Sequence, residues 1–336
     1  MNAHVSPAPV VAIVGATGAV GLALIHSLEQ RNFPVRSLRL LASARSAGRN
    51  MAFRGNQIPV EELTGDSFAG VDIAFFSAGA SISRKFAPIA VAAGAQVIDN
   101  SSAFRMQEDV PLVVPEANGA ELQSAPRIIA NPNCIAAILP TALAPPHRRW
   151  SITLISMSTY QAASGRGAAM MEELREGTRA HLEGEDFEPK TLPHSYAFNV
   201  FSHNSDIDPD TGYNGAERIV IAETRRILSQ TQLQLSVTCI RVPILRAPGI
   251  SLSIRFDEHV NTDSIRHALG GAPGIRLVDD RTANHFPMPS EASGEQDVLV
   301  GRLRDDLSDG LTRRISLAGP GLDVNELGAG HETVTV

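Results

Sequence analysis

The sequence predicts an α/β protein of two domains, in which a doubly wound parallel sheet is followed by an α+β domain. At 336 residues the chain has the length of two domains of roughly 100–200 residues each. Its first third alternates short apolar runs with helical patterns, which is typical of a parallel sheet. After about residue 130 the apolar runs lengthen and alternate with period 2, which indicates a mixed or antiparallel sheet.

The N-terminal pattern begins with a buried strand and continues as repeated strand–helix units. Val10–Val14 (VVAIV) reads as the first strand, and a helix is expected from about Val20 to Glu29. Its apolar positions Val20, Leu24 and Leu28 form one stripe. Further strands are expected at Leu38–Leu41, Ile73–Phe76, Val97–Asp99 and Ile128–Ala130, and helices at Ser83–Ala93 and Ile135–Leu143.

The second domain is expected to combine long strands with two amphipathic helices. Residues Glu185–Gly215 are rich in Asp, Asn, Pro and His and predict a long surface excursion. We therefore predict a nucleotide-binding domain over 1–133, a catalytic and dimerisation domain over 134–312, and an atypical, loosely ordered tail over 313–336. The expected strands are Trp150–Met157, Leu233–Leu245 and Ile250–Phe256, and the expected helices are Ala168–Leu182 and Ala216–Leu228.

Composition excludes several classes of protein. A net charge of −7 and a pI near 5.8 argue against a surface for nucleic acid or anionic membrane. No apolar run approaches the roughly 20 residues of a membrane helix, and the N-terminus lacks a secretory pattern. Two cysteines cannot form a disulfide framework in a chain of this size. We expect a cytoplasmic protein that acts on a small molecule and needs no metal.

A glycine-rich turn follows the first strand directly and opens the first helix. Gly15, Gly18 and Gly21 let the backbone turn tightly and approach a pyrophosphate, whose charge the helix N-terminus stabilises. The spacing GxxGxxG is a variant of the usual fingerprint, so a purely structural turn is the alternative. The cofactor-binding residues expected here are Gly15, Thr17, Gly18, Ala19, Val20 and Gly21.

The end of the second strand bears on the choice of cofactor. An NAD enzyme usually carries an acidic residue there for the ribose diol, whereas this chain has Arg45 and Ser46. These side chains suit a 2′-phosphate, which favours NADP. An exposed loop arginine without a ligand is the alternative.

Cys134 is the candidate nucleophile. It follows a strand and opens a helix, and a helix N-terminus lowers the pKa of a thiol and so favours the nucleophilic thiolate. A lone cysteine is more often a small buried hydrophobe. Cys239, inside the strand pattern LSVTCIRV, fits that second description.

Five short segments occur in order along the chain: the glycine turn, SSAFR (Ser101–Arg105), ANPNC (Ala130–Cys134), TYQAASG (Thr159–Gly165) and RVP (Arg241–Pro243). Together they resemble the aspartate-semialdehyde dehydrogenase family over about residues 8–311. The resemblance implies a Rossmann domain, a homodimer or homotetramer, and reversible, NADPH-dependent reduction of β-aspartyl phosphate to aspartate 4-semialdehyde. That reaction leads to lysine, threonine and methionine.

The resemblance also implies roles for individual residues. Cys134 matches the nucleophile that forms a thioester, and Gln161 matches the glutamine that orients the intermediate. Arg105 matches an arginine that binds phosphate, and Arg241 matches the arginine that pairs with the substrate carboxylate, for which a guanidinium is well shaped. The same segment implies that Ser164 and Gly165 contact the cofactor.

Three departures from the family pattern predict weaker activity. Pro248 stands where the family has its catalytic histidine, and general acid–base catalysis is typically worth about 10²–10⁴-fold. Ala216 and Ile219 stand where the family has a substrate-binding glutamate and a phosphate-binding lysine. Nothing after Gly310 resembles the family's final segment.

Two hypotheses follow. In the first, the chain is a slow dehydrogenase in which another group, with His194 and His203 as candidates, carries the proton. In the second, it is a catalytically impaired, NADP-binding relative with a structural or regulatory role. A third hypothesis is an N-acetyl-γ-glutamyl-phosphate reductase, but the pattern of that family around the nucleophile differs from the NPNC of this chain.

Overall fold

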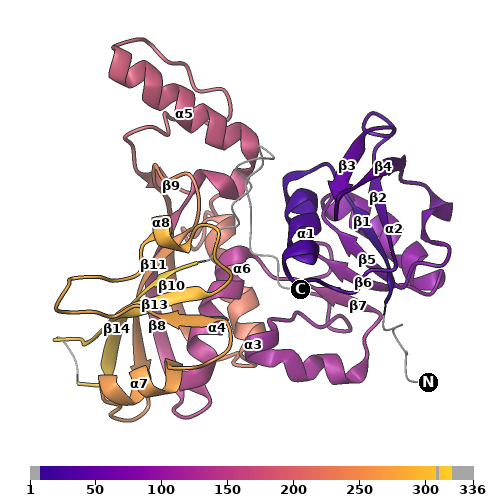
Figure 1. The fold of residues 1–336 in the computed structure, drawn as a ribbon. Helices are drawn as coiled ribbons and strands as arrows, with labels where there is room; N and C mark the ends of the chain where they lie inside the picture. Colours follow the sequence, from indigo (N-terminus) through magenta and orange to yellow (C-terminus); the bar gives the residue numbers. More distant parts are fainter. Residues whose placement is uncertain (1–7, 308–309, 320–336) are drawn as a thin grey trace. The chain divides into compact units, whose positions relative to one another are not determined.

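The computed structural model describes residues 8–307 and 310–319 and consists of two compact α/β units (Figure 1). The described residues up to Pro132 form the first unit, and those from Asn133 onward form the second. Each unit has its own seven-stranded sheet and its own hydrophobic core. We describe each unit by itself.

The first unit is a doubly wound sheet with strand order β3-β4-β2-β1-β5-β6-β7. All neighbouring pairs are parallel except β3 and β4, which form an antiparallel hairpin at one edge. The predicted parallel sheet is confirmed, and the edge hairpin is an addition to it. The strands are β1 (Val10–Val14), β2 (Ser37–Ala42), β3 (Asn50–Phe53), β4 (Asn56–Glu62), β5 (Ile73–Phe76), β6 (Gln96–Asp99) and β7 (Ile128–Ala130).

Strand β1 lies at the centre of this sheet, where the order of strands reverses. All five of its residues are buried, because both of its faces are covered. The chain passes through α1 (Ala19–Gln30) to β2 on one side of β1, and later through α2 (Ala80–Ala92) from β5 to β6 on the other. Ligands of doubly wound sheets bind at this reversal, beyond the carboxyl ends of the strands. Short helices α3 (Pro115–Asn118), η1 (Gly65–Phe68) and η2 (Gly119–Ser124) complete the unit.

The second unit has a mixed sheet with strand order β12-β13-β14-β11-β8-β10-β9. Strand β8 pairs in parallel with β10 and antiparallel with β11, so the predicted mixed sheet is confirmed. Its strands are β8 (Ile152–Gln161), β9 (Phe201–Ser202), β10 (Gln234–Arg241), β11 (Gly249–Phe256), β12 (Ile275–Leu277), β13 (Val298–Asp305) and β14 (Thr312–Ala318).

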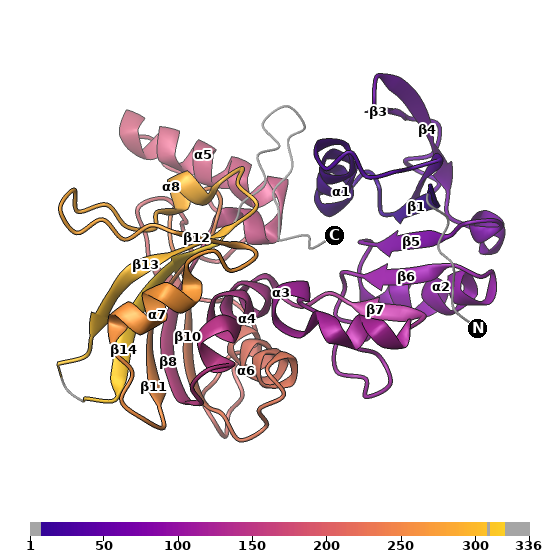
Figure 2. The ribbon, with the colours of Figure 1, turned by 60° about the horizontal axis from the view of Figure 1, so that its bottom comes forward.

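Helices α4 (Cys134–His147), α6 (Gly215–Ile227) and α7 (Thr262–Leu269) cover one face of this sheet (Figure 2). Inward residues of α4 such as Ile138 and Leu139 share a core with alternate residues of the strands, such as Ile155 and Leu252. The period-2 alternation along the strands thus reflects one face packed on helices. Remaining helices of the unit are α5 (Ala168–Glu183), α8 (Pro289–Ala292) and η3 (Ala163–Arg166).

Two expectations from the sequence need correction. The predicted excursion over Glu185–Gly215 is not purely a surface segment, because Leu192 and Tyr196 are buried in a small core with α5. The predicted loose tail is wrong for residues 313–318, which belong to β14 between β13 and β11. Residues 320–336 lie outside the described residues.

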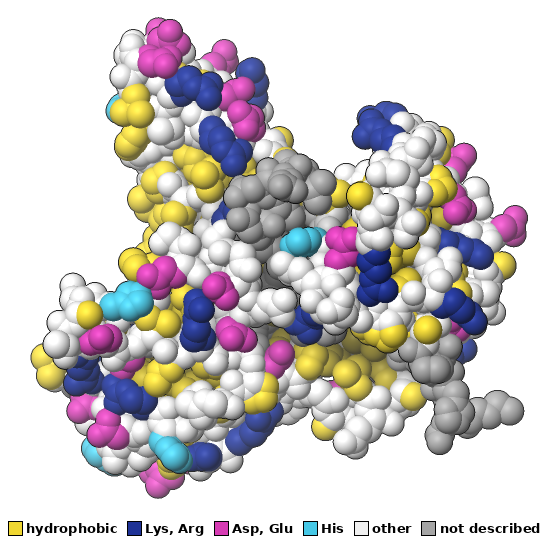
Figure 3. All heavy atoms as spheres, in the orientation of Figure 1, with side chains coloured by type: hydrophobic (Ala, Val, Ile, Leu, Met, Phe, Trp, Pro, Cys, Tyr) yellow, Lys and Arg dark blue, Asp and Glu magenta, His cyan; other side chains and the backbone are white. Residues whose placement is uncertain are grey.

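The surface shows where apolar side chains are exposed. Leu182, Phe198 and Val200 are exposed in α5 and the segment that follows it, and Figure 3 shows hydrophobic side chains gathering beneath α5. Within residues 8–307 and 310–319, no helix combines the length and hydropathy needed to cross a membrane.

Candidate active site

The glycine turn lies at the carboxyl end of β1 and is tightly packed against itself. Gly15 has φ +89°, a conformation that favours glycine, and its N–H donates to Leu41 O at 2.8 Å. A Cβ at Gly21 would stand 2.4 Å from Gly15 O. No side chain in the described part of the chain caps α1, so its first turn offers backbone N–H groups to an anion. This cradle, which a Cβ would fill, fits a pyrophosphate.

Arg45 and Ser46 lie in the turn that follows β2, the strand beside β1. Arg45 is exposed, whereas Ser46 is buried and its N–H donates to Ser43 O at 2.8 Å. Because β1 and β2 are parallel neighbours, their carboxyl ends meet at the same edge. The structure therefore brings the glycine turn and Arg45 to one edge of the sheet.

Arg105 lies in the first unit, where backbone carbonyls beyond two strand ends fix its guanidinium. Its Nε donates to Asn131 O at 2.8 Å and its Nη2 to Asn100 O at 2.9 Å. The preceding segment is held by the fully buried Asp99, which accepts hydrogen bonds from the hydroxyls of Ser83 at 2.6 Å and Ser101 at 2.8 Å. The arginine is thus held in one orientation, and its role toward phosphate stays a prediction.

Cys134 is the first residue of α4 and is partly exposed. The Asn133 side chain caps the helix by accepting from Ile135 N at 3.0 Å, and the Cys134 thiol contacts the same Oδ1 at 3.8 Å. The Asn133 N–H donates to Glu223 Oε2 at 2.6 Å, and Glu223 is 3% exposed on α6. The Cys134 sulfur therefore lies at a helix N-terminus that a hydrogen bond to α6 holds in place.

Gln161 and Arg241 are the last residues of β8 and β10, and they are partners in the register of these parallel strands. The Gln161 side-chain amide donates to Thr159 Oγ1 at 3.3 Å, and the Gln161 backbone carbonyl accepts from the Tyr196 hydroxyl at 2.9 Å. Ser164 and Gly165 follow in the short helix η3, where Ser164 is buried and Gly165 is exposed. The structure therefore places all four residues at one end of two neighbouring strands.

Arg241 is 2% exposed and connects several polar groups. Its Nε donates to Asn204 Oδ1 at 3.1 Å, and its Nη2 lies 3.0 Å from His203 Nε2. Burial lowers the pKa of Arg241, while electrostatic attraction to Tyr196 and Cys134 opposes that change. Arg241 and Cys134 are therefore within electrostatic reach of each other.

The positions that depart from the family pattern are also defined. Pro248 lies in the loop between β10 and β11, where its carbonyl accepts from Gly319 N at 2.9 Å. Ala216 and Ile219 lie on α6, and Ile219 is 39% exposed. Glu217 is buried and Arg218 is exposed, so these adjacent side chains point to different sides of the helix.

Cys239 fits the description of a buried structural cysteine. It is fully buried in β10, and burial raises the pKa of its thiol to about 11. Its N–H donates to Glu217 Oε1 at 2.8 Å. The thiol is therefore protonated and inaccessible under conditions in which Cys134 would act.

The sequence reasoning missed the groups that support the site. Glu217 and Glu223 lie on the buried face of α6 together with Val220 and Ile227, and both carboxylates accept backbone N–H groups. Charged residues on an otherwise apolar helical stripe are a signal that could have identified them. Tyr196 and Asn204 carried no such signal, because only the fold brings the segment after α5 to the end of β10.

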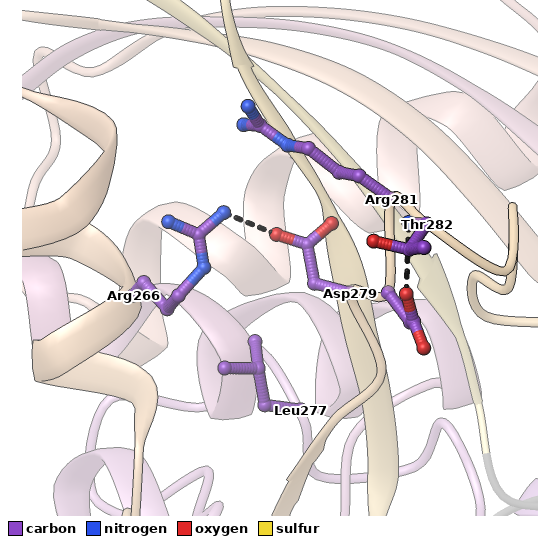
Figure 4. Close-up of a pocket in the computed structure, with 6 residues that line it drawn as sticks. Arg266, Leu277, Asp279, Arg281 and Thr282 are labelled. Carbon is purple, nitrogen blue, oxygen red and sulfur yellow. Dashed lines mark hydrogen bonds and ion pairs between the residues drawn. The ribbon is translucent and has the colours of Figure 1, made fainter.

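Two cavities of the second unit are lined by residues other than Cys134. One of about 640 Å³ is lined by Arg266, Asp279 and Arg281 among others, and in it Arg266 donates to Asp279 at 2.5 Å (Figure 4). Another of about 640 Å³ lies along β11 and β13 and includes Tyr160, Ser251 and Arg304. In the described part of the chain, no three or more His, Cys, Asp or Glu side chains are grouped to hold a metal ion.

These features define a class: a two-unit α/β oxidoreductase with a dinucleotide-binding sheet and a second unit that carries a cysteine in the first turn of a helix. The family models agree with this description. Residues 10–125 match the semialdehyde dehydrogenase NAD-binding domain, and residues 143–316 match the semialdehyde dehydrogenase dimerisation domain.

Individual relatives narrow the class. The chain is 45% identical over 303 residues to an aspartate-semialdehyde dehydrogenase of Synechocystis sp., covering 90% of this chain and 89% of the relative. It is 44% identical over 305 residues to that of Bacillus subtilis, covering 88% of each. A solved aspartate semialdehyde dehydrogenase II of Vibrio cholerae, complexed with ASA, superposes with a TM-score of 0.89 at 35% identity and 94% coverage of each chain. The chain belongs to the aspartate-semialdehyde dehydrogenase family.

Proposed function

We propose that this chain is an NADP-dependent aspartate-semialdehyde dehydrogenase. It interconverts aspartate 4-semialdehyde and β-aspartyl phosphate through a thioester on Cys134, in the biosynthesis of lysine, threonine and methionine. The observation that carries the proposal is the placement of Cys134 at a capped helix start, within electrostatic reach of the buried Arg241. That pair combines a nucleophile with a group that binds a carboxylate.

Each residue has a defined task in the oxidative direction. Arg241 binds the substrate carboxylate, and the Cys134 thiolate adds to the aldehyde carbon to give a thiohemiacetal, which the Gln161 amide orients. NADP held at the turn of Gly15, Gly18 and Gly21 would supply the hydride acceptor. The thioester left on Cys134 is then attacked by phosphate, which Arg105 binds, and β-aspartyl phosphate leaves as the thiolate reforms.

The proton on the thiohemiacetal oxygen has to leave in this sequence. Pro248 has neither donor nor acceptor on its side chain, and its carbonyl already accepts from Gly319 N. We therefore expect turnover well below that of a relative with histidine at this place, by about 10²–10⁴-fold if no other group compensates.

NADP is preferred over NAD in this proposal, because Arg45 is exposed at the carboxyl end of β2 with no carboxylate beside it in the turn Ser43–Gly48. The protein would work in the cytoplasm as a homodimer. The exposed Leu182, Phe198 and Val200 support an interface, since apolar patches of this kind commonly mark surfaces that a partner covers.

A catalytically impaired, NADP-binding relative is the second candidate. Pro248, Ala216 and Ile219 together favour it, because three side chains that can move protons or bind substrate are replaced by apolar ones. Retention of Cys134 and Arg241 favours the enzyme.

One assay separates the two candidates. NADPH formation is followed with aspartate 4-semialdehyde and phosphate for the wild type, Pro248→His and Cys134→Ala. Slow turnover that disappears in Cys134→Ala and rises in Pro248→His supports the enzyme. A silent wild type that still binds NADP supports the impaired relative. If Pro248→His has no effect, Ala216 or Ile219 also limits the rate.

A further inference from the structure

His203 lies beside the guanidinium of Arg241 because of the short strand β9. Phe201 and Ser202 pair antiparallel with the end of β10, and the His203 N–H donates to Cys239 O at 2.9 Å. The next two side chains, His203 and Asn204, then both reach the guanidinium of Arg241. A segment rich in polar residues is thereby tied to the buried arginine.

The contact with Arg241 determines which ring nitrogen carries the proton. A guanidinium has only donors, so His203 Nε2, at 3.0 Å from Nη2, has to be the unprotonated acceptor. The neutral ring then carries its proton on Nδ1, which faces the Ser205 hydroxyl at 3.1 Å. The Ser205 N–H also points at Nδ1, at 3.3 Å, which favours the opposite tautomer, but the shorter contact at Nε2 has a charged donor and is the stronger of the two.

The Ser205 hydroxyl continues the chain of hydrogen bonds to the start of α6. It accepts from Ala216 N at 3.0 Å and donates to Asn214 Oδ1 at 3.3 Å. Asn214 caps α6 through a hydrogen bond from Glu217 N at 3.0 Å, and Glu217 returns one to Asn214 N at 2.8 Å. His203 is thus fixed from a helix terminus on one side and holds Arg241 on the other.

The orientation of Arg241 leaves one nitrogen for a ligand. Nε and Nη2 are used by Asn204 and His203, while Nη1 is buried and makes no hydrogen bond within the described part of the chain. The neighbouring Tyr196 hydroxyl gives its proton to Gln161 O, and its oxygen attracts the guanidinium without satisfying Nη1. A buried, unsatisfied donor on a charged group is costly, and an anionic ligand would remove that cost.

We propose that His203 is a positioning residue for the substrate carboxylate: as a neutral, Nδ1-protonated imidazole it orients Arg241 so that Nη1 faces the carboxylate. It does not carry the proton that Pro248 cannot take, because both of its ring nitrogens are used in this arrangement. The inference rests on the proposed function, in that Arg241 binds a carboxylate close to Cys134.

The test uses alkylation of Cys134, which does not depend on turnover. Iodoacetate carries a carboxylate and iodoacetamide is its neutral counterpart, so the ratio of their rates at Cys134 reports attraction by Arg241. The ratio is measured by mass spectrometry for the wild type, Arg241→Leu, His203→Leu and His203→Gln. His267→Leu makes the same change at an exposed histidine of α7 and is the control.

The expected result is a ratio that falls roughly tenfold in Arg241→Leu and His203→Leu, the size expected for losing a hydrogen bond to a charged group. His203→Gln keeps an acceptor and should stay within about threefold of the wild type, as should His267→Leu. In a variant background with measurable turnover, such as Pro248→His, His203→Leu should raise KM for aspartate 4-semialdehyde by more than it lowers kcat.

Two outcomes overturn the inference. One is a rate ratio in His203→Leu equal to that of the wild type while the ratio in Arg241→Leu has fallen, because Arg241 would then be oriented without the imidazole. The other is an equal ratio in the wild type and Arg241→Leu, because the guanidinium would then not face anions at Cys134. If the protein forms no NADPH, that result counts against the proposed function only. The alkylation ratios still decide whether His203 orients Arg241.

Discussion

Replacing Gly21 by alanine should weaken both the first unit and its hold on NADP. A Cβ there stands 2.4 Å from Gly15 O and 2.6 Å from Ala16 Cα, whereas ordinary contact begins at 3.4 Å. The turn therefore has to move by the difference, about 1 Å, and the atoms in its way are backbone atoms that cannot rotate aside.

The size of the effect follows from two opposing contributions. Alanine is favoured over glycine in a helix by about 1 kcal/mol, and overpacking a tight site costs about 1–3 kcal/mol. We expect the free energy of unfolding to fall by about 1–2 kcal/mol, since rigid backbone puts the cost at the upper end. A shift of about 1 Å in this turn should break hydrogen bonds to the charged pyrophosphate, each worth about 1.5–3 kcal/mol, and so weaken NADP binding at least roughly tenfold.

Urea unfolding followed by circular dichroism measures the first quantity, and a fluorescence titration with NADP measures the second. Gly119→Ala is the control in the same unit, because its nearest neighbour to an added Cβ is Pro115 Cβ at 4.0 Å. It should leave NADP binding unchanged and stability equal or slightly higher. A Gly21→Ala protein as stable and as tightly binding as the wild type would show that this contact does not shape the turn.

Three further predictions concern charge and protonation. Arg45→Ala should reduce the preference for NADP over NAD at least tenfold in a binding titration, since a guanidinium pairs strongly with a phosphate, while Arg49→Ala should not. Native protein at pH 8 should react with one equivalent of iodoacetamide, at Cys134, because the Cys239 pKa of about 11 keeps that buried thiol protonated. The pKa of His203 is lowered to about 4 by burial and by neighbouring arginines, so its contribution to stability is present above pH 6.5 and is lost as pH falls toward 4. The wild type should therefore lose about 2–3 kcal/mol more than His203→Gln over that range.

Each of these has an outcome that would contradict it. Equal losses of NADP affinity in Arg45→Ala and Arg49→Ala would mean that general positive charge, and not Arg45, selects the cofactor. Two equivalents of label on native protein would mean that β10 opens and exposes Cys239. Parallel pH profiles for the wild type and His203→Gln would mean that the imidazole is not held neutral in the folded state.

The sequence predicted most of the first sheet, because its strands are short apolar runs that only a buried strand explains. Val10–Val14, Ile73–Phe76 and Ile128–Ala130 begin and end in the structure at the predicted residues. The hairpin of β3 and β4 was missed because most of its residues are exposed or polar, as in NQIPVEE, and only Phe53 and Val60 of the two strands are buried. Edge strands have this character in general.

The sequence predicted where Cys134 lies because its strand and helix are local, and it missed contacts that the tertiary fold decides. Cys134 follows from its place between a strand and a helix, both visible in the sequence. The contact of His203 with Arg241 depends on β9, two residues long, whose pairing no periodicity could indicate. The strand β14 was overlooked because Arg313 and Arg314 interrupt its apolar alternation, although Arg313 is 1% exposed in the fold.

The matched ends of β8 and β10 restrict how this chain can change. Side chains alternate between the two faces of a sheet, so displacing either strand by a single position would send Gln161 or Arg241 to the opposite face. Insertions and deletions should therefore be tolerated in the connections around these strands and not within them. The number of residues in β8 and β10 is therefore constrained together with the identities of Gln161 and Arg241.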